Sequence, residues 1–252
     1  MAGTDLAETL GITKWVPPVP TQMAGDARPA PALLPWPDIE NIKRHPDLFP
    51  PGEPVVATEK IHGTACMATW DVSSAELLVS SRGLGARRLS LHQADANLYW
   101  QVARQFRFAE LLAELADQLA AVRVGLFGEA FGAGIQDLAY GQGRGERAFA
   151  AFDLAWDDGD GVQRWADPDQ CSELLSGRLP VVPELWRGGY DPTVLADLAE
   201  GVEQVSGGEH HLREGIVVRS QRGRYAAQVG GRAIAKFVSD AYLTRKGGTE
   251  FE

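Results

Sequence analysis

Short runs of β-forming residues, separated by turn residues such as Gly, Asp and Ser, dominate most of the chain. The runs VVATE (55–59), TACMATW (64–70) and ELLVSS (76–81) have the length and composition typical of strands. Two longer apolar runs, VRVGLFGEAFG (122–132) and RAFAAFDLAW (147–156), predict buried strands. The pattern therefore favours a fold that is rich in β-sheet.

Helical spacing appears in three places. Apolar residues recur every three or four positions over residues 98–119, which predicts one long helix. Asp167-Pro168 and Asp191-Pro192 each place a capping residue before a proline, and this predicts two further helix starts. The second of these helices has an apolar stripe that extends to Val205.

The C-terminal part of the sequence returns to strand-like runs. EGIVVRS (214–220), GRYAAQV (223–229) and AIAKFVS (233–239) predict a β-meander, followed by a short helix. Strands and helices interleave without a regular βαβ rhythm. The fold class is therefore expected to be α+β, with antiparallel sheets flanked by helices.

The N-terminal part contains eleven prolines between residues 16 and 54. Because proline lacks a backbone donor and has a fixed φ, neither a helix nor an inner strand is expected there. We divide the chain into a Pro-rich arm or linker, residues 1–53, and a folded domain, residues 54–252. Three aromatic residues are candidate anchors of the arm on that domain: Trp15, Trp36 and Phe49.

Composition excludes several classes of protein. In 252 residues, 44% of them hydrophobic, no apolar run approaches the ~20 residues that span a bilayer. The N-terminus lacks the basic start and apolar stretch of a secretory signal. Cys66 and Cys171 are too far apart for a metal knuckle. We expect a cytoplasmic protein with no membrane partner.

Charge is distributed unevenly. The formal net charge is −10, yet residues 213–246 carry six Arg and two Lys against two acids. A basic strip on an acidic body can attract a polyanion. A solvated, Arg-rich hairpin explains the same pattern, and charge alone leaves both interpretations open.

Six short segments contain polar residues within or beside apolar strands. Each alone has a structural explanation, such as a surface lysine or a core phenylalanine. Together they supply two lysines, two carboxylates, an arginine and an aromatic ring, which is the set that nucleotidyl transfer requires. The segments are Glu59–Thr64, Ser80–Gly83, Leu126–Gly132, Ala151–Leu154, Glu214–Val218 and Ala233–Phe237.

In this order, the motifs Lys-x-His-Gly, Ser-Arg-Gly, Phe-Gly-Glu, Phe-Asp-Leu, Glu-Gly-Ile-Val-Val and a final Lys resemble those of the covalent nucleotidyltransferases. Over residues 54–246 the chain is most similar to ATP-dependent RNA ligases of the phage RNA ligase 2 type and their bacterial nick-sealing relatives. DNA ligases and capping enzymes usually have Asp where His62 stands. The resemblance implies an ATP-grasp-like nucleotidyltransferase domain, ATP with Mg²⁺ or Mn²⁺ as cofactors, and RNA repair on RNA ends or nicked duplexes.

The resemblance also implies a role for each matching residue. Lys60 would attack ATP and hold AMP, and Lys236 would contact the α-phosphate and help expel pyrophosphate. Glu129 would bind the ribose and, with Glu214, help to hold the metal ion. Phe152 would stack on adenine.

Other residues are assigned to recognition. Glu59 would help to read adenine, and Arg82 would touch the nucleotide or the RNA end. Arg219, Arg222 and Arg224, in the basic segment, are predicted to bind nucleic acid.

Two features depart from the family pattern. Where these ligases often have the first lysine of a Lys-x-Lys pair, this chain has Ile234, with Arg232 two positions earlier. Either pyrophosphate handling is weaker or Arg232 substitutes. The resemblance leads us to look for an accessory domain, and the sequence shows no appended OB-fold domain. We expect one of three explanations: a trimmed domain, a minimal ligase, or a partner that supplies an OB-fold module.

Two alternative functions remain open at this point. The same motifs could serve an end-adenylating or capping-type nucleotidyltransferase that does not seal strands. A non-catalytic module that binds nucleic-acid ends is the second alternative, although the complete set of acids and lysines argues against it.

Overall fold

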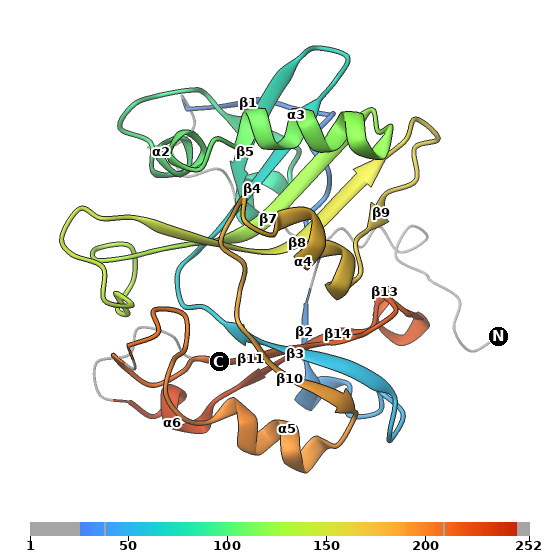
Figure 1. Ribbon diagram of the computed structural model, residues 1–252, viewed down its shortest axis with the longest axis vertical. Helices are drawn as coiled ribbons and strands as arrows, with labels where there is room; N and C mark the ends of the chain where they lie inside the picture. Colours follow the sequence, from blue (N-terminus) through green and yellow to red (C-terminus); the bar gives the residue numbers. More distant parts are fainter. Residues whose placement is uncertain (1–25, 38, 209, 246–252) are drawn as a thin grey trace, which may run out of the picture.

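Two five-stranded β-sheets lie one above the other and enclose the centre of the molecule (Figure 1). This computed structural model describes residues 26–37, 39–208 and 210–245, so the candidate anchor Trp15 lies outside the described residues. The expected α+β architecture with antiparallel sheets is confirmed, except that β2 joins its sheet parallel to β14.

The first sheet has the strand order β5-β4-β7-β8-β9, and helices α2, α3 and α4 pack on it. Its strands are β5 (Glu76–Ser81), β4 (Thr64–Asp71), β7 (Arg123–Phe131), β8 (Ala148–Asp157) and β9 (Arg164–Trp165). The helices on or beside it are α1 (Arg82–Gly85), α2 (Leu98–Gln105), α3 (Phe108–Leu119) and α4 (Pro168–Leu175).

The second sheet has the order β10-β3-β11-β14-β2 and packs against α5. Its strands are β10 (Glu184–Gly189), β3 (Pro54–Lys60), β11 (Gly215–Ser220), β14 (Ile234–Val238) and β2 (Glu40–Asn41). Beside it lie α5 (Pro192–Ala199), α6 (Asp240–Leu243) and the 3₁₀ turns η2 (Ile42–Arg44) and η3 (Ala227–Val229). Two short ribbons complete the fold: β1 (Ala27–Pro29) with β6 (Leu89–Leu91), and β12 (Tyr225–Ala226) with β13 (Gly231–Arg232).

The prediction of one helix over residues 98–119 was wrong. Two helices, α2 and α3, are separated by Arg107, which adopts a left-handed conformation. The break allows both Phe106 and Phe108 to pack on Phe149, at ring distances of 6.0 and 4.9 Å. Residues two positions apart cannot share one face of a straight helix, so tertiary packing on the sheet overrides the helical pattern.

The predicted C-terminal meander was also wrong in its middle strand. Only β12, within the run 223–229, is extended, and it pairs with β13 outside both main sheets. Strand β14 pairs instead with β11. Similarly, α5 ends at Ala199, before the predicted stripe is complete.

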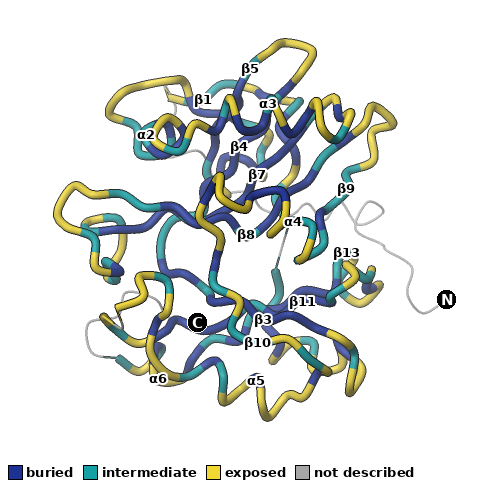
Figure 2. Tube along the Cα trace, viewed as in Figure 1, coloured by how far each residue is buried: buried dark blue, intermediate teal, exposed yellow. Residues whose placement is uncertain are grey.

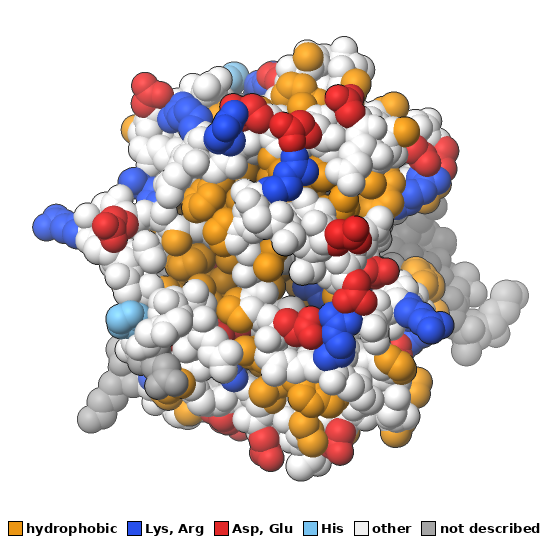
Figure 3. Space-filling model, viewed as in Figure 1, with side chains coloured by type: hydrophobic (Ala, Val, Ile, Leu, Met, Phe, Trp, Pro, Cys, Tyr) orange, Lys and Arg blue, Asp and Glu red, His pale blue; other side chains and the backbone are white. Residues whose placement is uncertain are grey.

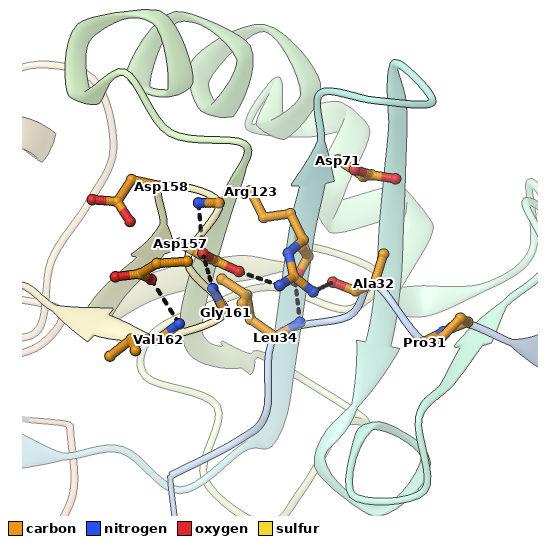
Figure 4. A network of polar contacts seen from close by, with 12 residues as sticks. Pro31, Ala32, Leu34, Asp71, Arg123, Asp157, Asp158, Gly161 and Val162 are labelled. Carbon is orange, nitrogen blue, oxygen red and sulfur yellow. Dashed lines mark hydrogen bonds and ion pairs between the residues drawn. The ribbon is translucent and has the colours of Figure 1, made fainter.

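The Pro-rich arm is packed on both sheets. Leu33 and Leu34 are fully buried against the first sheet, and the Leu34 N–H donates to Thr69 Oγ1 at 3.1 Å. Figure 4 shows Arg123 of β7 donating to the Ala32 carbonyl and pairing with Asp157 of β8. One guanidinium therefore ties the arm to two neighbouring strands.

The other two candidate anchors also pack as expected. Phe49 is buried with its ring 5.1 Å from that of Tyr190, beside the second sheet. The Trp36 ring lies edge-on to Phe127 and Phe152 of the first sheet, at 5.7 and 5.6 Å.

The strands of both sheets are mostly buried, whereas the loops that project from them are exposed (Figure 2). The chain passes from the second sheet to the first through a three-residue turn, 61–63, between β3 and β4. This crossing places the end of β3 between the two sheets. Among the described residues, no helix has the length and apolarity needed to cross a membrane.

Gly128 permits close packing in the first sheet. A Cβ added there would overlap the Phe149 ring and lie 2.5 Å from the Ala150 carbonyl oxygen. We expect Gly128→Ala to lower the free energy of unfolding by about 1–3 kcal/mol through overpacking. Gly83→Ala is the control, because its added Cβ meets nothing within 4 Å. Equal urea midpoints for the two variants would contradict this explanation.

Candidate active site

A cleft of about 280 Å³ lies between the two sheets. Eight of the ten predicted site residues line it, whereas Arg222 and Arg224 are not among its lining residues. The eight are Glu59, Lys60, Arg82, Glu129, Phe152, Glu214, Arg219 and Lys236. Segments that span most of the chain therefore converge on one cavity.

Lys60 ends β3 where the chain leaves the second sheet. Its backbone is paired with Gly215 of β11, so the preceding residue, Glu214, lies beside it. The Lys60 ammonium and the Glu214 carboxylate form an ion pair inside the cleft. A Cβ on Gly63 would overlap the Ala130 carbonyl, so only glycine lets the turn approach β7 this closely.

Glu59 is 1% exposed and faces the same cleft. Burial raises the pKa of its carboxyl to about 7, although the Gln204 N–H (2.8 Å) and the Arg213 guanidinium (3.7 Å) stabilise the anion. Near neutral pH the carboxyl is therefore divided between its two protonation states. It can donate or accept a hydrogen bond at the cleft wall.

A β-bulge aims Phe152 into the cleft. Opposite β7, Phe127 pairs with Asp153 and Gly128 pairs with Ala151, which leaves Phe152 as the extra residue of β8. A bulge re-aims side chains that regular alternation would send to the other face. The Phe152 ring is half-buried and forms an aromatic wall together with Trp36, which also lines the cavity.

Asp153 is the main residue that sequence reasoning missed. It is fully buried, receives two hydrogen bonds from Arg232, and lies 3.4 Å from Arg219 Nη1. The sequence does indicate such a role, because Asp153 is a carboxylate within an apolar strand and directly follows Phe152. The contact with Arg219 joins the two main sheets, and the contact with Arg232 joins the first sheet to the β12–β13 ribbon.

Arg232 does not fit the substitute role that the sequence suggested. Both of its terminal nitrogens donate to the Asp153 carboxylate, and its guanidinium lies 3.9 Å from the centre of the Trp165 ring. Ile234 is buried directly opposite Arg219 in the β11–β14 pair. On the neighbouring strand β11, the cation opposite Ile234, where related ligases often have a lysine, is therefore that of Arg219.

Arg219 and Lys236 face the cavity from adjacent strands. Arg219 Nη1 donates to the Phe152 carbonyl at 2.8 Å. Within the described part of the chain, its Nε and Nη2 atoms are buried without a hydrogen-bond partner. Because a buried donor without a partner is costly, this guanidinium is suited to an anionic ligand in the cleft.

Over its described residues, 213–245, the basic segment has most of its arginines in ion pairs and does not form a continuous basic strip. Its arginines are largely paired with acids from other parts of the chain, and Figure 3 shows Lys and Arg interspersed with Asp and Glu on the visible face. Arg224, for example, binds the Glu53 carboxylate and the Leu48 carbonyl. The other pairs are Arg213 with Glu59, Arg219 and Arg232 with Asp153, and Arg245 with Asp137.

Glu129 and Glu214 are the carboxylates that could hold a divalent metal ion in the cleft. Mg²⁺ in nucleotide sites is typically bound by one or two carboxylates, with phosphate oxygens and water completing its shell, and this pair fits that requirement. A separate acidic group, Asp157, Asp158 and Asp160, lies elsewhere. Backbone N–H donors and Arg123 lower the pKa of Asp157, so the protein itself stabilises that charge.

The fold matches solved RNA ligase structures. A Naegleria gruberi RNA ligase with PPi has a TM-score of 0.67 and 23% identity, covering 96% of this chain and 67% of that chain. An arginine variant of that ligase with ATP and Mn gives a TM-score of 0.69 and 23% identity, with the same coverage of both chains. Among curated proteins, none matches this sequence. The architecture is therefore that of an RNA ligase nucleotidyltransferase domain.

Family membership rests on the sequence itself. A family model described as RNA ligase matches residues 53–238. The chain belongs to the RNA ligase family of ATP-dependent nucleotidyltransferases.

The raised pKa of Glu59 predicts a pH-dependent stability. The folded protein binds this proton more tightly than the unfolded chain, so the associated stability is present below pH 4.5 and is lost as the pH rises through about 7. As the pH is raised from 5 to 8, we expect the free energy of unfolding of Glu59→Gln to increase by about 1–3 kcal/mol relative to that of the unchanged protein.

The control for this experiment is Glu203→Gln. Although burial opposes it, hydrogen bonds from Ser206 and His210 hold the pKa of Glu203 below its usual value. Its replacement should therefore not reproduce the gain on raising the pH. A pH-independent difference between Glu59→Gln and the unchanged protein in urea unfolding would contradict the prediction.

Proposed function

We propose that this protein is an ATP-dependent RNA ligase of the phage RNA ligase 2 type. It forms a covalent lysyl-AMP, transfers AMP to a 5′-phosphate end and seals that end to a 3′-hydroxyl, at nicks in duplexes. The observation that carries the proposal is the convergence of Lys60, Glu129, Phe152, Glu214 and Lys236 on one cleft between the sheets.

The first chemical step is assigned to Lys60. After the Lys60 ammonium has lost a proton to solvent, its neutral amine attacks the α-phosphorus of ATP. A phosphorus–nitrogen bond forms, the bond to the pyrophosphate leaving group breaks, and a second proton leaves the nitrogen to solvent. Glu214 holds Nζ inside the cleft before the reaction. Lys236 and Arg219, on neighbouring strands of the same face, are placed to receive the negative charge that develops on the phosphate oxygens.

The other lining residues are assigned to recognition of the nucleotide. Phe152, whose ring is packed against the edge of Trp36, stacks on adenine. Glu59 forms hydrogen bonds to the edge of adenine, and Glu129 binds the ribose. Arg82 contacts the nucleotide or the RNA end. Support comes from their shared cavity and from the raised pKa of Glu59, which lets its carboxyl act as donor or acceptor.

Glu214 and Glu129 would hold Mg²⁺ or Mn²⁺. A divalent ion there supplies electrostatic stabilisation of the phosphate charge when bound. The Naegleria gruberi ligase structures with ATP and Mn support this assignment by similarity of fold.

We retain residues 54–252 as the proposed nucleotidyltransferase domain and residues 1–53 as its arm. The described part of the arm contributes β2 to the second sheet and Trp36 to the cleft. We therefore assign the described part of the arm to the functional unit.

Retention of AMP on one lysine tests the proposed function. Incubation with labelled ATP and Mg²⁺ or Mn²⁺, followed by denaturing electrophoresis, should show label on the unchanged protein and none on Lys60→Ala. Lys43→Ala is the control, because this exposed lysine pairs with Asp240 outside the cleft. Equal labelling of Lys60→Ala would refute the assignment of the nucleophile.

The same assay separates the alternatives. Labelling by GTP in place of ATP would favour a capping-type enzyme. An adenylate that passes to a 5′-phosphate without joining would favour an end-adenylating enzyme. Absence of any adenylate would favour a binding module.

Arg222 and Arg224 are expected to differ in their contribution to RNA binding. Arg222 is exposed, whereas Arg224 is engaged by Glu53 and Leu48. Arg222→Ala should reduce the slope of log K against log salt by about 0.7–0.9 if it contacts a phosphate. Arg224→Ala should mainly lower thermal stability. An unchanged slope for Arg222→Ala would remove it from the interface.

A further inference from the structure

The imidazole of His62 is enclosed two residues from Lys60. His62 is 2% exposed, and its backbone N–H donates to Tyr140 Oη at 2.7 Å. Its ring Nδ1 shares a hydrogen bond of 2.8 Å with Tyr242 Oη, and its Nε2 lies 3.8 Å from Asp137 Oδ2. The turn 61–63 that follows Lys60 is therefore held through the side chain of His62 as well as through its backbone.

Tyr242 reaches this turn from the other end of the chain. It lies in α6, is fully buried, and its N–H donates to the capping Ser239 Oγ at 3.0 Å. The Ser239 N–H in turn donates to the Glu214 carbonyl at 3.0 Å. Helix α6 is thus attached to the backbone of the residue that pairs with Lys60.

Arg245 and Asp137 fix the orientation of the Tyr242 ring. The Arg245 guanidinium lies 3.5 Å from the ring centre, and its Nη1 donates to the Tyr242 carbonyl at 2.7 Å. Its Nη2 donates to Asp137 Oδ2 at 2.8 Å, the same oxygen that faces His62. The cation–π contact and the ion pair together hold the phenol ring with its hydroxyl against the imidazole of His62.

We propose that Tyr242 is a positioning residue for Lys60, acting through the imidazole of His62. This inference rests on the proposed function, in which Lys60 is the nucleophile. Because a small displacement of a reacting group can cost a large factor in rate, a hydroxyl that holds the adjacent turn affects the rate of adenylation more than the binding of ATP.

Tyr242→Phe tests this role, because it keeps the ring and its contact with Arg245 and removes only the hydroxyl. We expect the rate constant for formation of the lysyl-AMP at saturating ATP to fall about 10-fold, with the ATP concentration for half-saturation changed by less than about twofold. Tyr190→Phe is the matched control: this buried tyrosine packs on Phe49 in the same half of the molecule, and it does not line the cleft.

Two further measurements separate positioning from a general loss of stability. In a His62→Ala background, Tyr242→Phe should have no additional effect on the rate, since the contact is already lost. Without ATP or metal, the ring ¹⁵N resonances of His62 should shift in Tyr242→Phe and remain unchanged in Tyr190→Phe. Multiplicative rate effects, or unchanged His62 resonances, would overturn the proposal.

Should Tyr242→Phe melt well below the unchanged protein, Arg245→Met provides the same test by releasing the ring while leaving its hydroxyl. It should lower the rate constant without changing half-saturation by ATP, and an unaltered rate would overturn the role of Tyr242. Failure of the unchanged protein to form any lysyl-AMP would instead overturn the proposed function itself.

Discussion

Arg219 of the second sheet and Arg232 of the short β12–β13 ribbon hold one buried carboxylate of the first sheet, that of Asp153. Asp153 would be costly to bury alone, and its contacts with Arg219 and Arg232 compensate that cost only when the two sheets keep their spacing. Arg219 also binds the Phe152 carbonyl, and Arg232 packs on Trp165. The ion pairs of Asp153 with Arg219 and Arg232 therefore fix the spacing of the two sheets at the cleft and the position of the aromatic wall formed by Phe152 and Trp36.

The turn 61–63, which joins β3 to β4 and follows Lys60, the proposed nucleophile, is constrained on several sides. Gly63 fits against β7, Tyr140 binds the backbone of His62, and Tyr242 binds its ring. Lys60 thus projects from a turn whose position depends on both sheets and on α6. A lysine on a freely moving hairpin would lose this orientation and the rate advantage that comes with it.

The distribution of charge along the sequence did not predict which arginines are exposed to a ligand. The excess of arginines after residue 213 suggested a surface for polyanions, but most of these side chains neutralise acids that are distant in the sequence, as Arg224 does with Glu53. Pairing depends on which surfaces meet, and local composition contains no information about that. The same reason explains the helix break at Arg107, where packing of two aromatic rings on Phe149 outweighs a continuous helical stripe.

The sequence by itself determined the main strands, the helix starts at Asp167 and Asp191, and the ordered motifs that indicate nucleotidyl transfer, because these depend on local periodicity, capping and residue type. Only the tertiary structure decided that those motifs share one cleft, that a bulge turns Phe152 into it, and that Asp153 joins the sheets. Each of these depends on contacts between residues far apart in the chain, whose free energy exists only once both sheets have formed and packed.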